Sequence, residues 1–343
     1  MSSPAGASTD RQQRRQAQSQ ADRKKQAQPR RRSLTSRMQR RLISAGVLVI
    51  VFAIGTVMAF SSTPHATGPP VLHVHSVVSL SSVSAVAQVD GQSFVTNDLT
   101  DRLERFRTGG ISSSVALSGR PVAMVGAGGD LWVANMVSNT VQEFKASTLR
   151  VVRTIAVPDG PASLVVLGQK IWMANITANS VSSIALSTGK LSAPIPMAAG
   201  AVRIAAGFGS LWVTGTSDQV TQLQPNATDP RPREITVGQI PIGISVGDGS
   251  VWVANAASGS VSRIDPTTDR VVHEFRIGGQ PLVVSVVQGT VWVADGTAQT
   301  LRTIYPAPAS RLFNLRATPR AIVGMGSKVW IAEANPGGVA EAT

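Results

Sequence analysis

The chain contains no cysteine among its 343 residues. A protein without cysteine forms no disulfide, no thiolate metal site and no thiol-based active site, and it carries no lipid-modified cysteine. Histidine is also scarce, with four residues, and tyrosine occurs once. Stability must therefore come from the burial of apolar groups, which a long chain can achieve without cross-links.

An excess of positive charge is absent from most of the chain, although the formal net charge is +13. Residues 1–41 hold 12 Lys and Arg and two acidic residues, whereas the remainder holds 20 basic and 17 acidic residues. The same 41 residues lack Phe, Trp, Tyr and Ile, so they cannot bury a core. We predict a disordered basic tail over residues 1–41. The near-neutral remainder argues against nucleic-acid binding, which needs clustered Lys and Arg.

Charge is missing altogether from residues 42–60, an apolar run of 19 residues. At about 1.5 Å per residue such a helix crosses a hydrocarbon core of about 30 Å. Six arginines lie within residues 30–41, and no Lys or Arg follows the run until Arg102. This asymmetry predicts a single-pass signal-anchor in the plasma membrane, with the tail in the cytoplasm and the rest outside. A cleaved signal peptide is the alternative, but the basic and apolar parts are both too long for one.

After a Ser/Thr/Pro-rich linker at residues 61–70, one pattern occupies the rest of the chain. Seven segments align on one aromatic position, and the steps between them are 38, 40, 40, 40, 40 and 38 residues. The aromatic residues are Phe94, Trp132, Trp172, Trp212, Trp252, Trp292 and Trp330. A fixed period of about 40 residues indicates one supersecondary unit copied seven times.

The unit that begins at Pro241 shows four short strand-like runs separated by turns, and nowhere in the repeats is there a helical apolar period of ten or more residues. A proline precedes the aromatic by 11 residues in five units and is expected to begin the innermost strand. The sequence therefore predicts an all-β, seven-bladed β-propeller over residues 71–343. The alternating run at residues 71–80 is expected to complete the seventh blade, which closes the ring.

The tetrapeptides at the aromatic position resemble those of the YVTN-repeat β-propeller family. Four of them are Phe94-Val-Thr-Asn97, Trp132-Val-Ala-Asn135, Trp252-Val-Ala-Asn255 and Trp292-Val-Ala-Asp295, and an Asp265-Pro-Thr-Thr268 turn accompanies them. The resemblance covers about four fifths of the chain. It implies the propeller fold and leaves the activity open, because propellers host many unrelated functions.

A polar residue stands three positions after the aromatic in six units. These candidate face-lining residues are Asn97, Asn135, Asn175, Asn255, Asp295 and Glu333. Asn and Asp at strand ends commonly bond their own backbone in Asx-turns, so a structural role is the simpler interpretation. The alternative is a polar ring on one face of the propeller that contacts a ligand.

Signs of enzymatic chemistry are few. Propellers of the virginiamycin B lyase type use histidine, glutamate and a divalent metal at the central channel. Among the four histidines only His273 falls within the repeats, in a run expected to form an outer strand. The chain also lacks H-E-x-x-H and G-x-S-x-G motifs. We therefore expect no metal site, no cofactor and no catalytic residues.

The sequence as a whole predicts a non-catalytic binding or sensing module outside the membrane. Its expected partner is a protein or a cell-envelope ligand, bound by a monomeric ring. A lyase or hydrolase of the virginiamycin B lyase type is the alternative function, and nucleic-acid binding is the weaker third.

Overall fold

The computed structural model describes residues 74–107, 110–225, 232–306, 312–325, 328–334 and 337–342. The predicted basic tail, membrane segment and linker lie outside these residues, as do the first three positions of the run at 71–80. Over the described ranges, no helix is long and apolar enough to cross a membrane.

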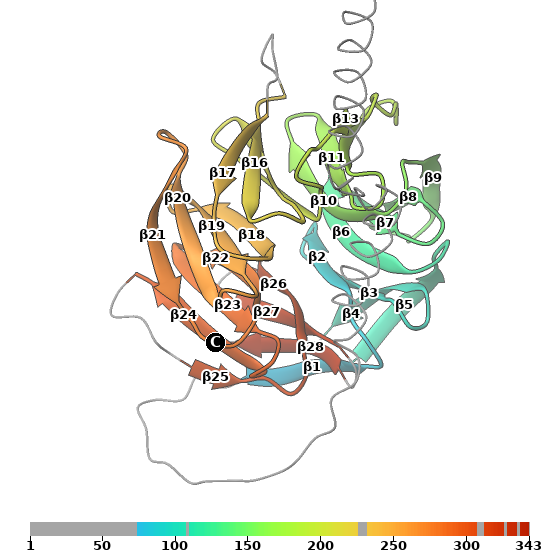
Figure 1. The fold of residues 1–343 in the computed structure, drawn as a ribbon. Coiled ribbons are helices and arrows are strands. Elements are labelled where there is room, and N and C mark those ends of the chain that lie inside the picture. Colours follow the sequence, from blue (N-terminus) through green and yellow to red (C-terminus); the bar gives the residue numbers. More distant parts are fainter. Residues whose placement is uncertain are drawn as a thin grey trace, which may run out of the picture. The chain divides into compact units, whose positions relative to one another are not determined.

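The described residues form seven antiparallel sheets of four strands each, which we number as blades in chain order (Figure 1). Blade 1 contains β2 (Ala85–Val89), β3 (Gln92–Asn97), β4 (Arg102–Arg107) and β5 (Gly110–Ala116). Blade 2 contains β6 (Pro121–Ala127), β7 (Asp130–Asn135), β8 (Thr140–Lys145) and β9 (Val151–Ala156). Blade 3 contains β10 (Pro161–Leu167), β11 (Lys170–Asn175), β12 (Ser180–Ala185) and β13 (Ile195–Pro196).

The second half of the ring continues the same order. Blade 4 contains β14 (Arg203–Gly207), β15 (Ser210–Thr214), β16 (Gln219–Leu223) and β17 (Arg233–Thr236). Blade 5 contains β18 (Pro241–Gly247), β19 (Ser250–Asn255), β20 (Ser260–Asp265) and β21 (Arg270–Arg276). Blade 6 contains β22 (Pro281–Val287), β23 (Thr290–Asp295), β24 (Thr300–Tyr305) and β25 (Leu312–Asn314). Blade 7 contains β26 (Pro319–Met325), β27 (Lys328–Glu333), β28 (Gly337–Ala342) and β1 (Val74–Leu80).

The innermost strands β2, β6, β10, β14, β18, β22 and β26 contact one another in this order, and β26 contacts β2. This closed cycle confirms the seven-bladed propeller. In blade 7 the outermost strand comes from the start of the described chain, because β1 pairs antiparallel with β28. The two ends of the described chain therefore lie in one sheet.

The repeated prolines occupy the positions that the sequence predicts. Five of the innermost strands begin with them, at Pro121, Pro161, Pro241, Pro281 and Pro319. Each proline pairs with the polar residue at the end of the second strand, and a β-bulge follows it directly. Proline donates no hydrogen bond, which suits the first position of a strand whose ladder is interrupted there.

The aromatic residues lie on the second strand of each blade and pack between neighbouring blades. Trp132, Trp212 and Trp252 have no exposed surface, and Phe94 is equally buried. Trp252 contacts Phe275 of its own blade and Tyr305 of blade 6, with ring centroids 5.7 and 5.4 Å apart. The repeated aromatic thus joins one blade to the next, as its large apolar area favours.

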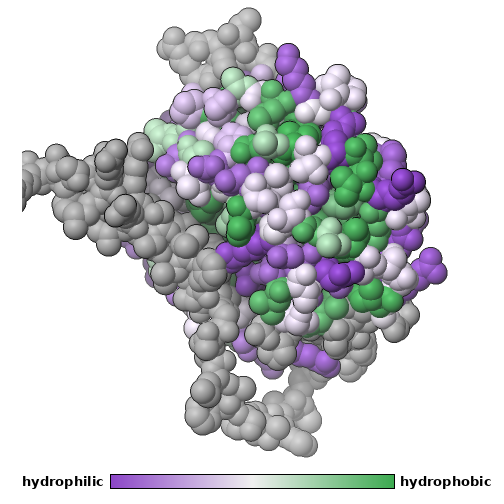
Figure 2. Space-filling model, turned by 90° about the vertical axis from the view of Figure 1, so that its right-hand side faces the viewer, coloured by the Kyte–Doolittle hydropathy of each residue, from purple (hydrophilic) through white to green (hydrophobic). Residues whose placement is uncertain are grey.

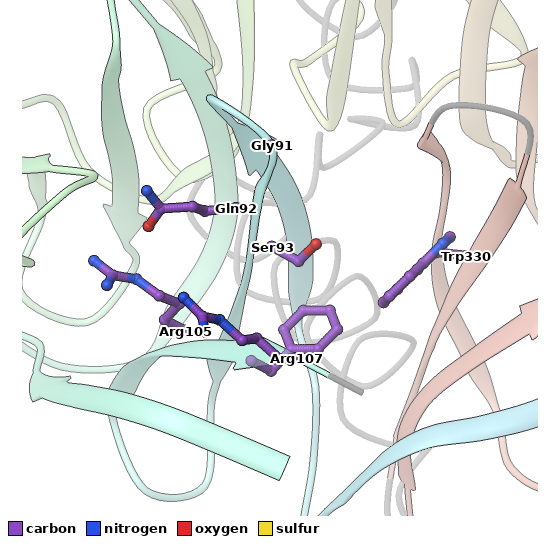
Figure 3. A pocket seen from close by; sticks show the side chains of 7 residues that line it. Gly91, Gln92, Ser93, Arg105, Arg107 and Trp330 are labelled. Atoms are coloured by element: carbon purple, nitrogen blue, oxygen red, sulfur yellow. The ribbon is translucent and has the colours of Figure 1, made fainter. Parts of the chain in front are cut away.

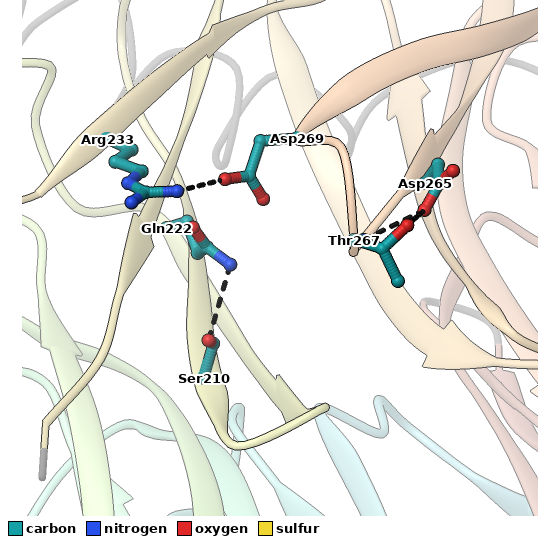
Figure 4. Close-up of polar contacts among 6 residues, drawn as sticks. All are labelled: Ser210, Gln222, Arg233, Asp265, Thr267 and Asp269. Atoms are coloured by element: carbon teal, nitrogen blue, oxygen red, sulfur yellow. Dashed lines mark hydrogen bonds and ion pairs between the residues drawn. The ribbon is translucent and has the colours of Figure 1, made fainter.

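Polar contacts add to this packing at the blade edges (Figure 4). Arg233 Nη1 of blade 4 lies 2.7 Å from Asp269 Oδ2 of blade 5. Within blade 5, Asp265 accepts hydrogen bonds from Thr267 N and Oγ1, which fixes the Asp-Pro-Thr-Thr turn. On the side of the molecule shown in Figure 2, apolar side chains occur in small groups separated by polar ones.

Candidate functional site

The six polar residues that follow the aromatic are all buried. Their exposed fractions lie between 0 and 4% for Asn97, Asn135, Asn175, Asn255, Asp295 and Glu333. They stand at the ends of the second strands and are not part of the open surface of either face. Contact with a ligand, the alternative that the sequence leaves open, stays a prediction, and these side chains form hydrogen bonds within the propeller.

Each of these side chains makes hydrogen bonds within the propeller, although Oδ1 of Asn135, Asn175 and Asn255 has no partner among the described residues. Asn97 Oδ1 accepts from Leu99 N and Thr100 N, and Asp295 Oδ1 accepts from Thr297 N and Ala298 N, as in Asx-turns. In three other blades the asparagine amide donates to hydroxyl or amide oxygens of the third strand. The series therefore fixes the turns between second and third strands.

Glu333 takes the same position in blade 7 with a longer side chain. Its Oε1 accepts hydrogen bonds from Arg316 N and Ala317 N, which belong to the segment before β26. Burial raises the pKa of Glu333, and the two backbone donors partly oppose that shift. The carboxyl group thus ties the second strand of blade 7 to the loop that enters the blade.

His273 lies on β21, the outermost strand of blade 5, where the sequence predicts an outer strand. Its ring packs edge-on against Phe275 at a centroid distance of 4.3 Å. The part of the chain that the structure describes contains no group of three or more His, Cys, Asp or Glu residues arranged to hold a metal ion.

A pocket of about 430 Å³ lies between blade 7 and blade 1 (Figure 3). It is lined by Gly91, Gln92, Ser93, Arg105, Phe106, Arg107 and Trp330. Ser93 and Trp330 face each other across the pocket, whereas Gln92 and Arg105 point away from Trp330. The pocket adjoins the beginning of β3, so it lies at the opposite end of this strand from Asn97.

The pocket exists because blade 1 departs from the repeat at one position. The residue directly before the aromatic is Leu131, Ile171, Leu211, Val251, Val291 or Val329 in the other six blades, and each is at most 7% exposed. Each of these residues belongs to the same apolar cluster as the aromatic of the preceding blade. Blade 1 has Ser93 there, which is too small and too polar to fill that space.

Trp330 shows the consequence, because it is half-buried whereas Trp132, Trp212 and Trp252 are fully buried. Its ring rests on Phe106, with centroids 5.1 Å apart and the planes inclined by 49°. The indole Nε1 is buried and has no hydrogen-bond partner among the described residues. The pocket therefore offers an aromatic wall, with Ser93 on the opposite side.

Charged groups frame this pocket. Arg107 is exposed at its edge, and the Nη2 atom of Arg105 donates to the carbonyl oxygens of Ala146 and Ser147 in blade 2. Glu104 lies two residues before Phe106 on β4, and burial raises its pKa against the opposing charge of Arg102. Arg107 thus places a positive charge at the rim, and the interior wall of the pocket is aromatic.

Sequence reasoning missed this pocket. One signal for the pocket lies in the sequence, since Ser93 is the single polar residue at a position that is otherwise Leu, Ile or Val. The arrangement of the blades in a ring shows that this position faces the preceding blade.

Comparison with known proteins establishes the fold. The chain matches no protein-family model, and no curated protein is recognisably similar to it in sequence. Among solved structures, a catalytically inactive virginiamycin B lyase from Staphylococcus aureus, solved with quinupristin, superposes with a TM-score of 0.71 at 14% identity, covering 79% of this chain and 99% of the lyase.

Two other solved structures are also similar. The WD40 domain of Neurospora crassa Pan2 gives a TM-score of 0.66 at 9% identity, covering 80% of this chain and 97% of that domain. BamB from Moraxella catarrhalis gives 0.57 at 12% identity, covering 76% of this chain and 85% of BamB. Identities this low show a shared propeller architecture and leave the activity open.

Proposed function

We propose that this protein is a membrane-anchored, extracytoplasmic binding module in which the pocket between blades 7 and 1 receives a ring of a cell-envelope ligand. The carrying observation is the replacement of a packing residue by Ser93, which leaves Trp330 half-buried beside a pocket of about 430 Å³. Small-molecule sites have volumes of about 300–1,000 Å³ and combine apolar walls with few polar groups.

The indole of Trp330 and the hydroxyl of Ser93 give the proposed ligand its chemistry. A flat apolar ring face packs on an indole. A sugar ring of an envelope polymer has such a face. The apolar stretch at residues 42–60 and the arginines before it support the proposed anchor and orientation.

Filling the pocket tests the proposal. The change Ser93→Leu restores the residue type of the other blades, so we expect a folded ring that has lost its ligand. Binding of the purified full-length protein to fragments of envelope polysaccharide would be measured by isothermal titration calorimetry. Ser187→Leu, in an exposed turn of blade 3, is the matched control. Equal affinity of wild type, Ser93→Leu and Ser187→Leu would refute the pocket as the binding site.

A lyase activity is the second candidate, and the similarity to virginiamycin B lyase favours it. Incubating the protein with quinupristin and a divalent metal, followed by mass spectrometry, tests this candidate directly. A linearised or cleaved product that appears only with intact protein would show that the protein is an enzyme and not a binding module.

The tetrapeptides at the aromatic position also support a proposed kinship with the YVTN-repeat propellers.

A further inference from the structure

One face of the ring carries an exposed aromatic residue. We call it the first-turn face, because it holds the turns between the first and second strands of the blades, at residues 90–91, 128–129, 168–169, 208–209, 248–249 and 288–289. Phe208, in the turn between β14 and β15, is 51% exposed. Among the described Phe, Trp and Tyr residues, it alone is exposed. Glycines flank it on both sides, so its neighbours in the chain do not cover the ring.

The backbone of Phe208 is in a conformation that large side chains rarely adopt. Its φ is +54°, in the left-handed region. The five other described turns hold a glycine or a polar residue at this position, also with positive φ, namely Asp90, Gly128, Gly168, Asp248 and Gln288. Neither burial nor backbone preference accounts for a phenylalanine here, which points to a contact outside the chain.

Exposed charges on the first-turn face are mainly basic. Three exposed basic residues are held in ion pairs, namely Lys145, Arg233 and Lys328. Five more exposed basic residues lie at strand ends or in loops of this face, namely Arg107, Arg150, Lys170, Lys190 and Arg270. The exposed acidic residues among the described residues of this face are Asp90 and Asp248. The face therefore has an excess of positive charge.

The opposite face of the ring has no such excess among its described residues. Exposed Asp159 and Asp218 there are balanced by exposed Arg276 and Arg316. The basic character is thus a property of the face that carries Phe208.

The chain enters the propeller at the first-turn face. β1 begins at Val74, which pairs with Ala342, and Ala342 pairs with Val329 near the start of β27. The second strand of each blade begins at the first-turn face, so Val74 lies there too. The 13 residues from 61 to 73 separate Val74 from the apolar run and can span at most about 45 Å. The first-turn face is therefore the face that the chain reaches from the proposed membrane anchor.

We propose that the first-turn face lies against an anionic lipid surface, with Phe208 at the level of the headgroups. This inference rests on the membrane anchor of the proposed function and adds an orientation of the ring to it. Aromatic side chains are enriched at membrane–water interfaces, and Lys and Arg are attracted to anionic headgroups. Lys170 and Lys190 belong to blade 3, whose innermost strand contacts β14, so the aromatic and basic contacts come from neighbouring blades.

Energy transfer to labelled lipid measures which face lies near the membrane. Because the chain has no cysteine, Ser187→Cys on the first-turn face and Ala178→Cys on the opposite face of the same blade give single, exposed sites for a donor dye. The labelled full-length protein would be reconstituted in vesicles of phosphatidylglycerol and phosphatidylcholine with an acceptor on the headgroups. Strands of six residues hold the two faces about 20 Å apart, so transfer from Ser187→Cys should exceed that from Ala178→Cys at least about twofold.

Substitutions on the first-turn face should reduce the transfer from the Ser187→Cys label. Phe208→Gly restores the residue type of blades 2 and 3, so it should lower the transfer and leave the melting temperature unchanged or higher. Lys170→Gln combined with Lys190→Gln should lower it as well, as should vesicles of pure phosphatidylcholine. Phe208→Trp should preserve the transfer. Val137→Ala, which removes a 70% exposed apolar side chain from the opposite face, is the matched control and should have no effect.

Two failures can be told apart by extraction with alkaline carbonate. Equal transfer from the two labels in a protein that resists extraction would overturn the orientation and leave the anchor standing. Equal transfer with Phe208 and with Phe208→Gly would overturn the role of the aromatic ring, as would a lower melting temperature of this variant. Release of the protein by carbonate would refute the anchor of the proposed function, and this inference with it.

Discussion

The interface between blades 5 and 6 and the interface between blades 7 and 1 are built from the same repeat, yet they differ in packing. In the first, fully buried Trp252 shares an apolar cluster with Val291. In the second, half-buried Trp330 faces Ser93 and a pocket of about 430 Å³. One apolar side chain per interface therefore decides whether two blades pack closely or leave a pocket between them.

The largest effect should come from the strand that gives blade 7 its outer edge. Removing residues 71–80 deletes the whole of β1 and exposes the edge of β28. We expect a loss above about 4 kcal/mol in the free energy of unfolding, outside the range of most single substitutions. Urea unfolding of proteins that begin at residue 61 and at residue 81 measures this loss. Equal midpoints would show that blade 7 does not need β1.

Next in size is the difference between the two tryptophans. Trp252→Ala should cost about 3–5 kcal/mol, because it empties a fully buried volume. Trp330→Ala should cost about 1–2 kcal/mol, since the indole is half-buried and a pocket already adjoins it. Chemical denaturation of both variants would check the order. A larger loss for Trp330→Ala would mean that the pocket does not weaken this interface.

Placing a serine at the same position of blade 6 should make the interface between blades 5 and 6 resemble the interface between blades 7 and 1. Val291→Ser removes a fully buried apolar side chain beside Trp252 and should cost about 2–3 kcal/mol. The reverse change, Ser93→Val, should raise stability by about 0.5–1.5 kcal/mol. Thermal unfolding of both variants would measure these opposite signs. If both variants lose stability equally, the identity of this residue does not control the packing.

The smallest effect concerns pH and the entry to blade 7. The pKa of Glu333 is raised above its ordinary value of 4.5 in the folded state, so the unfolded state binds fewer protons in the interval between the two values. Stability from this group is greatest below pH 4.5 and falls as the pH rises through that interval.

Glu333→Gln should remove this fall and slightly raise stability at pH 7, because the amide does not ionise. Unfolding midpoints between pH 4 and pH 8 would check it, with exposed Glu234→Gln as the control. An unchanged pH dependence in Glu333→Gln would assign the effect to other carboxyl groups. Glu143 and Glu104 are the alternatives, because burial raises the pKa of both.

Much of the fold could be predicted from particular residues. The aromatic spacing gave the number of blades, and Pro121, Pro161, Pro241, Pro281 and Pro319 marked the starts of innermost strands. These features are local and repeated, so each unit supports the interpretation of the others. The candidate site was less predictable, because the sequence does not distinguish Asn97, which forms an Asx-turn, from Asn135 and Asn175, which bond the third strand of their own blades.

The sequence by itself determined the seven-fold repeat. A period of about 40 residues, with one aromatic residue on the second strand of each unit, admits one regular way of burying apolar surface. Only the tertiary structure decided where the repeat is broken to form a site. Closing the ring brings Ser93 of the first unit against Trp330 of the last, 237 positions apart in the numbering. Side chains of the first and last units meet only when the chain closes on itself.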